Sequence, residues 1–521
     1  MSFISFPFVL FFAVLSAAYF LLPRRCQWPL LLVFSVVFYL AADARYAVFL
    51  LVTVVSAYIA VCRMDSRLKA QERHLAENKS LTREEKKSFR AGVKHRNRIT
   101  LTVCLVLNFS MLFFCKVLLL PGAAAAAEGT FLSFLSLGLP LGMSFYLFQS
   151  MGYCIDVYRG KAKAQRNFFR FALFTTYFPY LIQGPINSYA QLGENLWKPH
   201  DFDGKQWSFG LQRMLWGYFK KLVIADRIAP MVAALRAPEL GGTGFFLLTL
   251  SYALQIYGDF TGGIDITIGM SQCLGIPLRE NFLRPYFSKN IAEYWRRWHI
   301  SLGEWMKDYI FYPISVSAPM LRLSKAARAR FGNFGKRLPV YVASVATWLV
   351  TGIWHGLTPN FILWGMLNCL FIVGSEELSP LYERFHGRFH WKDKAWYGWF
   401  EILRMFLLMN FIRACDLFPH VGDYFAGLAR MVLHPNFAIL TDGTLLTLGL
   451  TALDFGILAV GIVLLFAVSL YQEKRGSVRE MLWGKNPWVR YSLLFILLLA
   501  VLLLGKYGTG YNASSFIYNQ F

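Results

Sequence analysis

The sequence predicts an all-α polytopic membrane protein, and three observations lead to that class. Of the 521 residues, 56% are hydrophobic and only 16% are charged, against roughly 25% in an ordinary soluble domain. The mean hydropathy is +0.42. The apolar residues also gather in long runs, and a membrane span needs about 20 of them. This composition excludes a soluble enzyme, a disordered protein and a receptor with a single membrane anchor.

Twelve apolar runs are candidates for the spans. Some are short enough to be amphipathic or re-entrant helices, so we expect about 11–13 transmembrane helices in all. The runs cover residues 6–22, 28–41, 46–61, 101–120, 131–157, 207–235, 245–270, 340–353, 361–373, 400–411, 445–470 and 491–504. Because no internal repeat or long polar linker separates them, we expect a single membrane domain over residues 1–521.

The distribution of charge predicts the orientation in the membrane. The net charge is +23, from 53 basic and 30 acidic residues. The loop 63–98 holds 12 Lys or Arg and 5 Asp or Glu, and the segments 159–170, 322–337 and 474–490 are also strongly basic. The positive-inside rule assigns all four to the cytoplasm. Both chain ends, including the tail 506–521, are then expected on the extracytoplasmic side. The excess positive charge is expected to set the orientation in the membrane and not to bind nucleic acid.

One segment, residues 257–313, holds several candidate functional groups. Asp259 and Asp265 lie in or beside an apolar run, and carboxylates inside a membrane are functional candidates. Glycines at 258, 262 and 263 predict a broken helix at the same place. Asp259 therefore has two interpretations, as a cap for freed backbone amides or as a group that acts in the site, and both stay open.

A Trp-rich amphipathic helix is predicted to begin at Asn290, where Glu293 completes a capping-box pattern. At about 100° per residue, one narrow stripe of this helix carries Ile291, Trp295, Trp298, Leu302, Trp305 and Tyr309. His299 lies at the edge of the stripe, either as a packed core residue or as a functional one. The carboxylates of the helix point away from it, so a carboxylate that orients His299 must come from another element.

His355 is the second histidine candidate. It lies between two apolar runs and is flanked by Gly352 and Gly356. Burying an imidazole is costly unless it is bonded or used, and the ordinary histidine pKa of about 6.5 suits proton transfer at neutral pH. The sequence leaves a structural and a catalytic interpretation open.

A metal site is not expected. His386 and His390 have a spacing that could ligate a metal on a helix, but they lie in a polar basic loop without a third ligand. The eight Cys contain no CxxC pair, and most of them lie in or beside apolar runs. We therefore interpret the two histidines as a solvated pair and the cysteines as small apolar packing residues.

Three stretches carry a family resemblance. They read ENFLRPYFSKNIAEYWRRWHISLGEWMKDYIFYP, TGIWHGLTPNFILWG and FIRACDLFPHVGDYF. They resemble the membrane-bound O-acyltransferase family, and most of all its bacterial polysaccharide branch, which includes alginate O-acetylation and has teichoic acid D-alanylation as a cousin. The specific resemblance covers residues 245–425.

The resemblance implies a ring of membrane helices around a narrow central tunnel. His355 matches the essential histidine of the family, and His299 matches a second histidine common in this branch. The implied reaction moves an acyl group from a cytoplasmic thioester, such as acetyl-CoA, to a hydroxyl, without a tightly bound cofactor. His355 would take the hydroxyl proton, and His299 would position the donor or stabilise the oxyanion. The expected tunnel and supporting residues are Trp354, Trp298, Trp295, Asn360, Asn368, Asn410 and Asp259.

The C-terminal tail extends this expectation. The chain ends SSFIYNQF, which resembles a terminal motif that serves the superfamily as an acyl relay through its tyrosine. Tyr518 is the matching residue, Asn519 replaces the usual aromatic, and a tail that only packs is the alternative. A relay implies a periplasmic or extracellular esterase-fold partner, in a protein surrounded by the lipid of the bacterial inner membrane.

The predicted function is O-acylation, most of all O-acetylation, of an extracytoplasmic polysaccharide. D-alanyl transfer to teichoic acid is the alternative within the family. A polymer transporter would show two related halves with broken helices in corresponding positions, and the sequence has no such repeat. A non-catalytic export scaffold would keep its function after His355 is replaced.

Overall fold

The computed structural model describes residues 3–120, 122, 129–130 and 138–507. All regular secondary structure within these ranges is helical, which confirms the predicted all-α class. Tyr518 and most of the tail 506–521 lie outside the described residues, and so does part of the predicted run 131–157.

Several helices are long and apolar enough to cross a membrane, which confirms the multi-pass class. Among the described residues six qualify by length and composition, and a pair bent by 54°, Pro359–Glu377 with Ser379–Phe389, makes a seventh if it is one span. Other predicted runs form helices that are short, such as α1 (Phe6–Leu21), or that are buried in the core. The six are Arg24–Ala42, Ala44–Glu77, Arg83–Leu118, Asn333–His355, Ala452–Arg475 and Pro487–Leu504.

The core is organised around α12 (Gly241–Cys273), a 33-residue helix whose side chains are mostly buried. Along it pack α10 (Gly204–Tyr218), the π-helical segment η5 (Phe219–Ala225) and α11 (Asp226–Ala234). Glycines permit the close approach, because a Cβ at Gly262 would lie 2.8 Å from the carbonyl oxygen of Gly217. Since α12 runs unbroken through this point, the predicted helix break is wrong, and the glycines serve helix packing.

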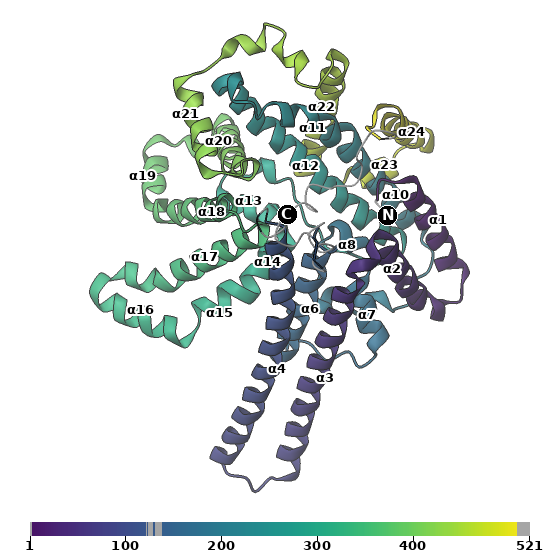
Figure 1. The fold of residues 1–521 in the computed structure, drawn as a ribbon, viewed down its shortest axis with the longest axis vertical. Coiled ribbons are helices and arrows are strands. Elements are labelled where there is room, and N and C mark those ends of the chain that lie inside the picture. Colours follow the sequence, from purple (N-terminus) through teal and green to yellow (C-terminus); the bar gives the residue numbers. More distant parts are fainter. Residues whose placement is uncertain (1–2, 121, 123–128, 131–137, 508–521) are drawn as a thin grey trace.

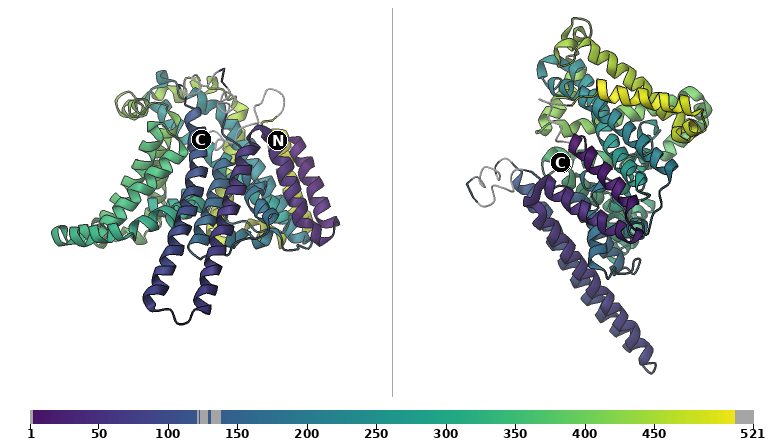
Figure 2. Two further views of the ribbon diagram at one scale, coloured as in Figure 1. Left: turned by 60° about the horizontal axis from the view of Figure 1, so that its bottom comes forward. Right: turned by 90° about the vertical axis from the view of Figure 1, so that its right-hand side faces the viewer.

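Two long helices, α3 (Ala47–Glu77) and α4 (Arg83–Leu118), form an antiparallel hairpin that extends well beyond the rest of the molecule (Figures 1 and 2). Thr82 and Glu85 form a capping box where α4 begins. Arg67 on α3 donates to the hydroxyl of Thr100 on α4 at 2.7 Å and so joins the two arms. The basic segment 63–98 is therefore helical, apart from the short turn at its tip.

The later part of the chain returns to the middle of the molecule. Here α16 (Ala318–Phe331) and the first half of α17 (Asn333–His355) form a projecting hairpin, while the other end of α17 points inward (Figure 1). Gly352 lets α17 approach α18 (Pro359–Glu377), since a Cβ there would lie 2.6 Å from the carbonyl oxygen of Phe361. This packing fixes the last residue of α17 beside the beginning of α18.

Candidate active site

His355 is the last residue of α17, and aromatic side chains contact its imidazole. The ring centroid of His355 is 4.6 Å from that of Trp354, 4.7 Å from that of Trp364 and 6.4 Å from that of Phe361. The histidine itself is half-buried. The three rings restrict where the imidazole can lie and shield part of it from water.

A buried lysine supports the end of α17. Lys116 on α4 is only 7% exposed, and its Nζ donates to the carbonyl oxygen of Trp354 and, at 3.4 Å, to that of His355. A cation is favourable here because the last carbonyls of a helix carry its partial negative charge. Sequence reasoning missed Lys116, although a lone lysine inside a long apolar run is a signal for a specific role.

His299 lies at a break between two short helices. Here α13 (Ile291–Arg297) ends, and His299 adopts a left-handed backbone conformation, with φ of +44°, as the N-cap of α14 (Ile300–Met306). Asn290 does begin α13, and its side chain accepts from the backbone N–H of Glu293 at 2.9 Å. The prediction of one continuous helix through the Trp stripe is nevertheless wrong. A non-glycine residue in this conformation is strained, and such strain is concentrated at functional sites.

Asn281 holds the break in place and orients His299. Its Oδ1 accepts from the N–H of Ser301 at 3.1 Å and from the Ser301 hydroxyl at 2.9 Å, and it lies 3.3 Å from His299 Nδ1. Its backbone carbonyl accepts from the N–H of Ile300 at 3.0 Å. The orienting group thus comes from another element, as expected, but it is an amide instead of a carboxylate. Nothing in the local pattern around Asn281 had distinguished it.

Trp354 connects the two histidines. Its ring centroid is 4.6 Å from that of His355 and 6.4 Å from that of His299, so one indole contacts both imidazoles. Phe148 of α6 (Met143–Tyr158) packs against the same indole at 5.5 Å, and Phe260 of α12 lies 4.9 Å from His299. The structure therefore brings His355, Trp354 and His299 together from two separate parts of the chain.

Arg413 adds a second buried cation to the site. It ends α20 (Ala395–Arg413) and is 4% exposed. Its guanidinium lies 4.1 Å from the ring centroid of Trp298, a cation–π contact, and donates to the hydroxyl of Tyr294 at 3.2 Å. Burial first, and the charge of Arg413 second, lower the pKa of His299 to about 3. His299, which lies outside the candidate spans, is therefore neutral at physiological pH.

We expect His299 to make the stability of the fold depend on pH on the acid side. Its pKa is about 3 in the folded protein and about 6.5 in an unfolded chain, so the folded state binds fewer protons. Above about pH 6.5 the imidazole is neutral in both states and the free energy of unfolding is highest. As the pH falls toward 3, only the unfolded chain takes up the proton, so the free energy of unfolding falls. In detergent, the Tm of the parent should fall more steeply below about pH 6.5 than that of His299→Gln. Parallel curves would contradict this assignment.

The other residues that the sequence predicted for the site lie around the two histidines and make different contacts. Trp298 is 1% exposed and lies under Arg413. Trp295 donates its indole N–H to Asn368 Oδ1 at 3.1 Å, so this amide orients a tryptophan instead of a histidine. Asn360 donates to the carbonyl oxygen of Cys415 at 3.3 Å and ties α18 to the segment after α20. Asn410 is buried on α20 itself.

Asp259 belongs to an ion pair in the helix core. Its Oδ1 lies 2.5 Å from the Nζ of Lys221 on η5, and the same Nζ lies 2.8 Å from Asp226 Oδ1. Because α12 is unbroken here, the carboxylate has no freed helix amides to cap, and the capping interpretation is wrong. Asp259 stabilises the packing of η5 on α12, one residue before the phenylalanine that contacts His299.

Fold and site together define a class: a multi-pass helical membrane protein in which two histidines meet around one tryptophan. Within the described ranges, no group of three or more His, Cys, Asp or Glu side chains could hold a metal ion. Residues 162–416 match the model of the membrane-bound O-acyltransferase family. This match confirms the resemblance over that segment, which contains His299 and His355.

Curated relatives match about half of the chain. It is 38% identical over 231 residues to the probable alginate O-acetylase AlgI of Azotobacter vinelandii, covering 44% of this chain and 42% of the relative. It is 30% identical over 311 residues to the peptidoglycan O-acetyltransferase of Helicobacter pylori, covering 54% and 55%. It is 25% identical over 278 residues to the teichoic acid D-alanyltransferase of Bacillus subtilis, covering 52% and 66%. The chain thus spans about half the length of the alginate relatives that it matches.

Proposed function

We propose that this chain transfers an acetyl group from a cytoplasmic thioester, acetyl-CoA, for the O-acetylation of an extracytoplasmic polysaccharide. The observation that carries the proposal is the placement of His355 and His299 around Trp354, inside the segment that matches the family. The relatives favour acetyl over D-alanyl transfer, because the identity is 38% to the alginate O-acetylase and 25% to the D-alanyltransferase. D-alanyl transfer is the second candidate.

His355 is the general base in this proposal. Its neutral imidazole takes the proton of the acceptor hydroxyl as the oxygen attacks the thioester carbonyl. A C–O bond forms, the C–S bond breaks, and the proton passes from His355 to the departing thiolate. The fixed positive charges of Lys116 and Arg413 favour the negative charge that develops during the attack.

His299 positions the donor. Asn281 Oδ1 also accepts from the backbone N–H of Ser301, which identifies this atom as the oxygen of the amide. An oxygen can only accept, so His299 Nδ1, at 3.3 Å from it, carries the proton in the neutral ring. The other ring nitrogen, Nε2, is then an acceptor, which suits it to hold an N–H or O–H group of the substrate instead of an oxyanion. Trp354, Trp298 and Trp295 exclude water that would hydrolyse the thioester.

We further propose that the acyl group leaves through the C-terminal tail. Tyr518 would attack the thioester first, forming an ester, and a secreted esterase-fold partner would then take the acyl group to the polymer. The support is the resemblance of the terminal residues to the relay motif. The corresponding location is the inner membrane of a bacterium.

The test is a transfer assay with the full chain in proteoliposomes. Acetyl-CoA with a labelled acetyl group and a D-alanyl thioester of a carrier protein are offered separately, and free thiol and label on the protein are measured. We expect thiol release from acetyl-CoA, with label on the parent and not on Tyr518→Phe. Thiol release without label on the parent would reject the relay alone. Release from the D-alanyl thioester only would favour the second candidate, and release from neither would reject the transferase.

A further inference from the structure

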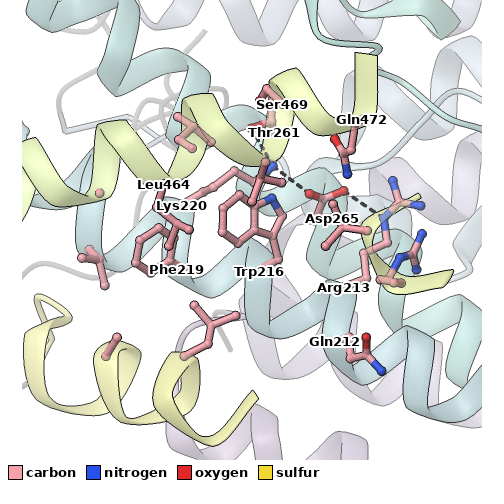
Figure 3. Close-up of a pocket in the computed structure, with 18 of the residues that line it drawn as sticks. Gln212, Arg213, Trp216, Phe219, Lys220, Thr261, Asp265, Leu464, Ser469 and Gln472 are labelled. Atoms are coloured by element: carbon pink, nitrogen blue, oxygen red, sulfur yellow. Dashed lines mark hydrogen bonds and ion pairs between the residues drawn. The ribbon is translucent and has the colours of Figure 1, made fainter. Parts of the chain in front are cut away.

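A cavity of about 1020 Å³ separates the last two long helices from the core (Figure 3). One side is formed by α22 (Ala452–Arg475) and α24 (Pro487–Leu504), and the other by α10, η5 and α12. Both α22 and α24 pack on η5, and only 22% and 11% of their apolar windows are buried, so they lie at the lipid-facing periphery. Neither His299 nor His355 lines this cavity, so it is distinct from the site described above.

The long part of the cavity is apolar. Aliphatic side chains from both outer helices line it, among them Ile457, Val460 and Leu464 on α22 and Leu493 and Leu497 on α24. A water-filled cavity would be costly between such surfaces inside a membrane, because nothing there can bond to the water. Hydrocarbon chains match this lining.

The other part of the cavity is strongly polar, and its charges pair in a defined way. Asp265 lies 2.9 Å from Arg213 and 2.7 Å from Lys220 (Figure 3). Arg213 also lies 2.5 Å from Glu280. Arg284, a fifth lining residue, lies 2.5 Å from Glu473. Glu473 also lies 2.9 Å from Arg297, which in turn lies 2.7 Å from Glu293. With Arg297 and Glu293 included, the four cations and four carboxylates of this network balance one another.

Arg479 is the basic residue that this pairing leaves over. It belongs to α23 (Val478–Trp483), and in the described part of the chain its hydrogen bonds go to neutral oxygens, the Phe209 carbonyl at 3.2 Å and Gln272 Oε1 at 2.9 Å. Burial and the charge of Arg213 lower the pKa of Arg479, and the carboxylates of Asp265, Glu280 and Glu480 offset this only in part. A bound anion would remove that penalty, and arginine binds phosphate well through its planar fork of donors.

We propose that this cavity binds one anionic glycerophospholipid, with its phosphate at Arg479 and its acyl chains between α22 and α24. The positive-inside rule assigns the segment 474–490 to the cytoplasm, so the lipid comes from the inner leaflet, which is where anionic headgroups attract basic segments. The lipid fills the space between the two outer helices, α22 and α24, and the core, and its acyl chains pack against both.

Native mass spectrometry of the full chain in detergent tests the proposal. Phosphatidylglycerol and phosphatidylethanolamine with identical acyl chains are titrated separately. We expect one phosphatidylglycerol to bind in preference to phosphatidylethanolamine. Arg479→Gln should weaken the binding of phosphatidylglycerol about tenfold, as expected for the loss of a charged hydrogen bond. The affinity for phosphatidylethanolamine should not change. Arg475→Gln, at an exposed arginine that does not line the cavity, is the matched control.

A second variant tests the apolar part. Gly456 lines the cavity, and a Cβ there would meet no atom within 4 Å. The side chain in Gly456→Phe should therefore occupy the cavity and weaken the binding of both lipids. Gly374→Phe, at an equally open glycine on α18 outside the cavity, is its control. The proposal fails if the parent does not distinguish the two lipids, if Arg479→Gln binds like the parent, or if inorganic phosphate alone occupies the site as well as the lipid does.

Discussion

Replacing His355 with alanine is expected to lower acetyl transfer at least about 100-fold, the contribution of a positioned general base. The fold should survive, because His355 is half-buried at the end of α17 and the packing of α17 on α18 depends on Gly352. The measurement is thiol release from acetyl-CoA by the purified variant in proteoliposomes, with its Tm recorded beside that of the parent.

His386→Ala is the matched control for this prediction. His386 lies on α19 (Ser379–Phe389), and the site described above does not include it. We expect this variant to retain the activity of the parent. If His355→Ala also retained thiol release, the proposed role of His355 as general base would be wrong, whereas a non-catalytic scaffold would release no thiol even as the parent.

The second large effect is expected at Asn281. In Asn281→Leu, which has a similar volume, the backbone N–H and the hydroxyl of Ser301 both lose their acceptor, and His299 loses the group beside Nδ1. A buried polar group without a partner costs about 1–3 kcal/mol. We therefore expect a lower free energy of unfolding together with a loss of kcat/KM for acetyl-CoA, because the strained turn at His299 relaxes.

Asn281→Asp separates the two consequences. It keeps an acceptor oxygen for Ser301, so most of the stability should return. It also places a carboxylate beside His299 Nδ1, which favours the protonated ring. We expect activity that falls on the acid side at a higher pH than in the parent. A pH profile identical to that of the parent would show that His299 is not oriented through this contact.

The fold class could be predicted because its signals are local, and local motifs also made the two histidines candidates. Membrane spans follow from runs of apolar residues, and the basic hairpin follows from the charge of 63–98. His355 was a candidate because an imidazole between apolar runs is conspicuous, and His299 because its motif resembles one common in the family branch. That Trp354 contacts both imidazoles could not be read from the sequence, since it depends on how α17 meets the α13–α14 break.

The features that were missed depend on contacts between distant residues. The helical stripe continues past Trp298. The break between α13 and α14 is held by hydrogen bonds that Asn281, 18 residues before His299, accepts from Ile300 and Ser301. The glycines of α12 look like helix breakers in isolation, whereas in the structure the backbone of α10 lies against Gly262 and that of η5 against Gly258. Lys116 contacts α17 across 238 residues of sequence, and Arg413 contacts Trp298 from α20. No local pattern contains these partners.

The α3–α4 hairpin connects the site mechanically to the basic segment 63–98. The tip where α4 begins and Lys116 near its other end belong to one unbroken helix. At 1.5 Å per residue, they are about 50 Å apart. Lys116 is bonded to the backbone of Trp354 and His355. The helix therefore joins the tip of the basic hairpin to the backbone that carries His355, and a tilt at the tip would displace that backbone.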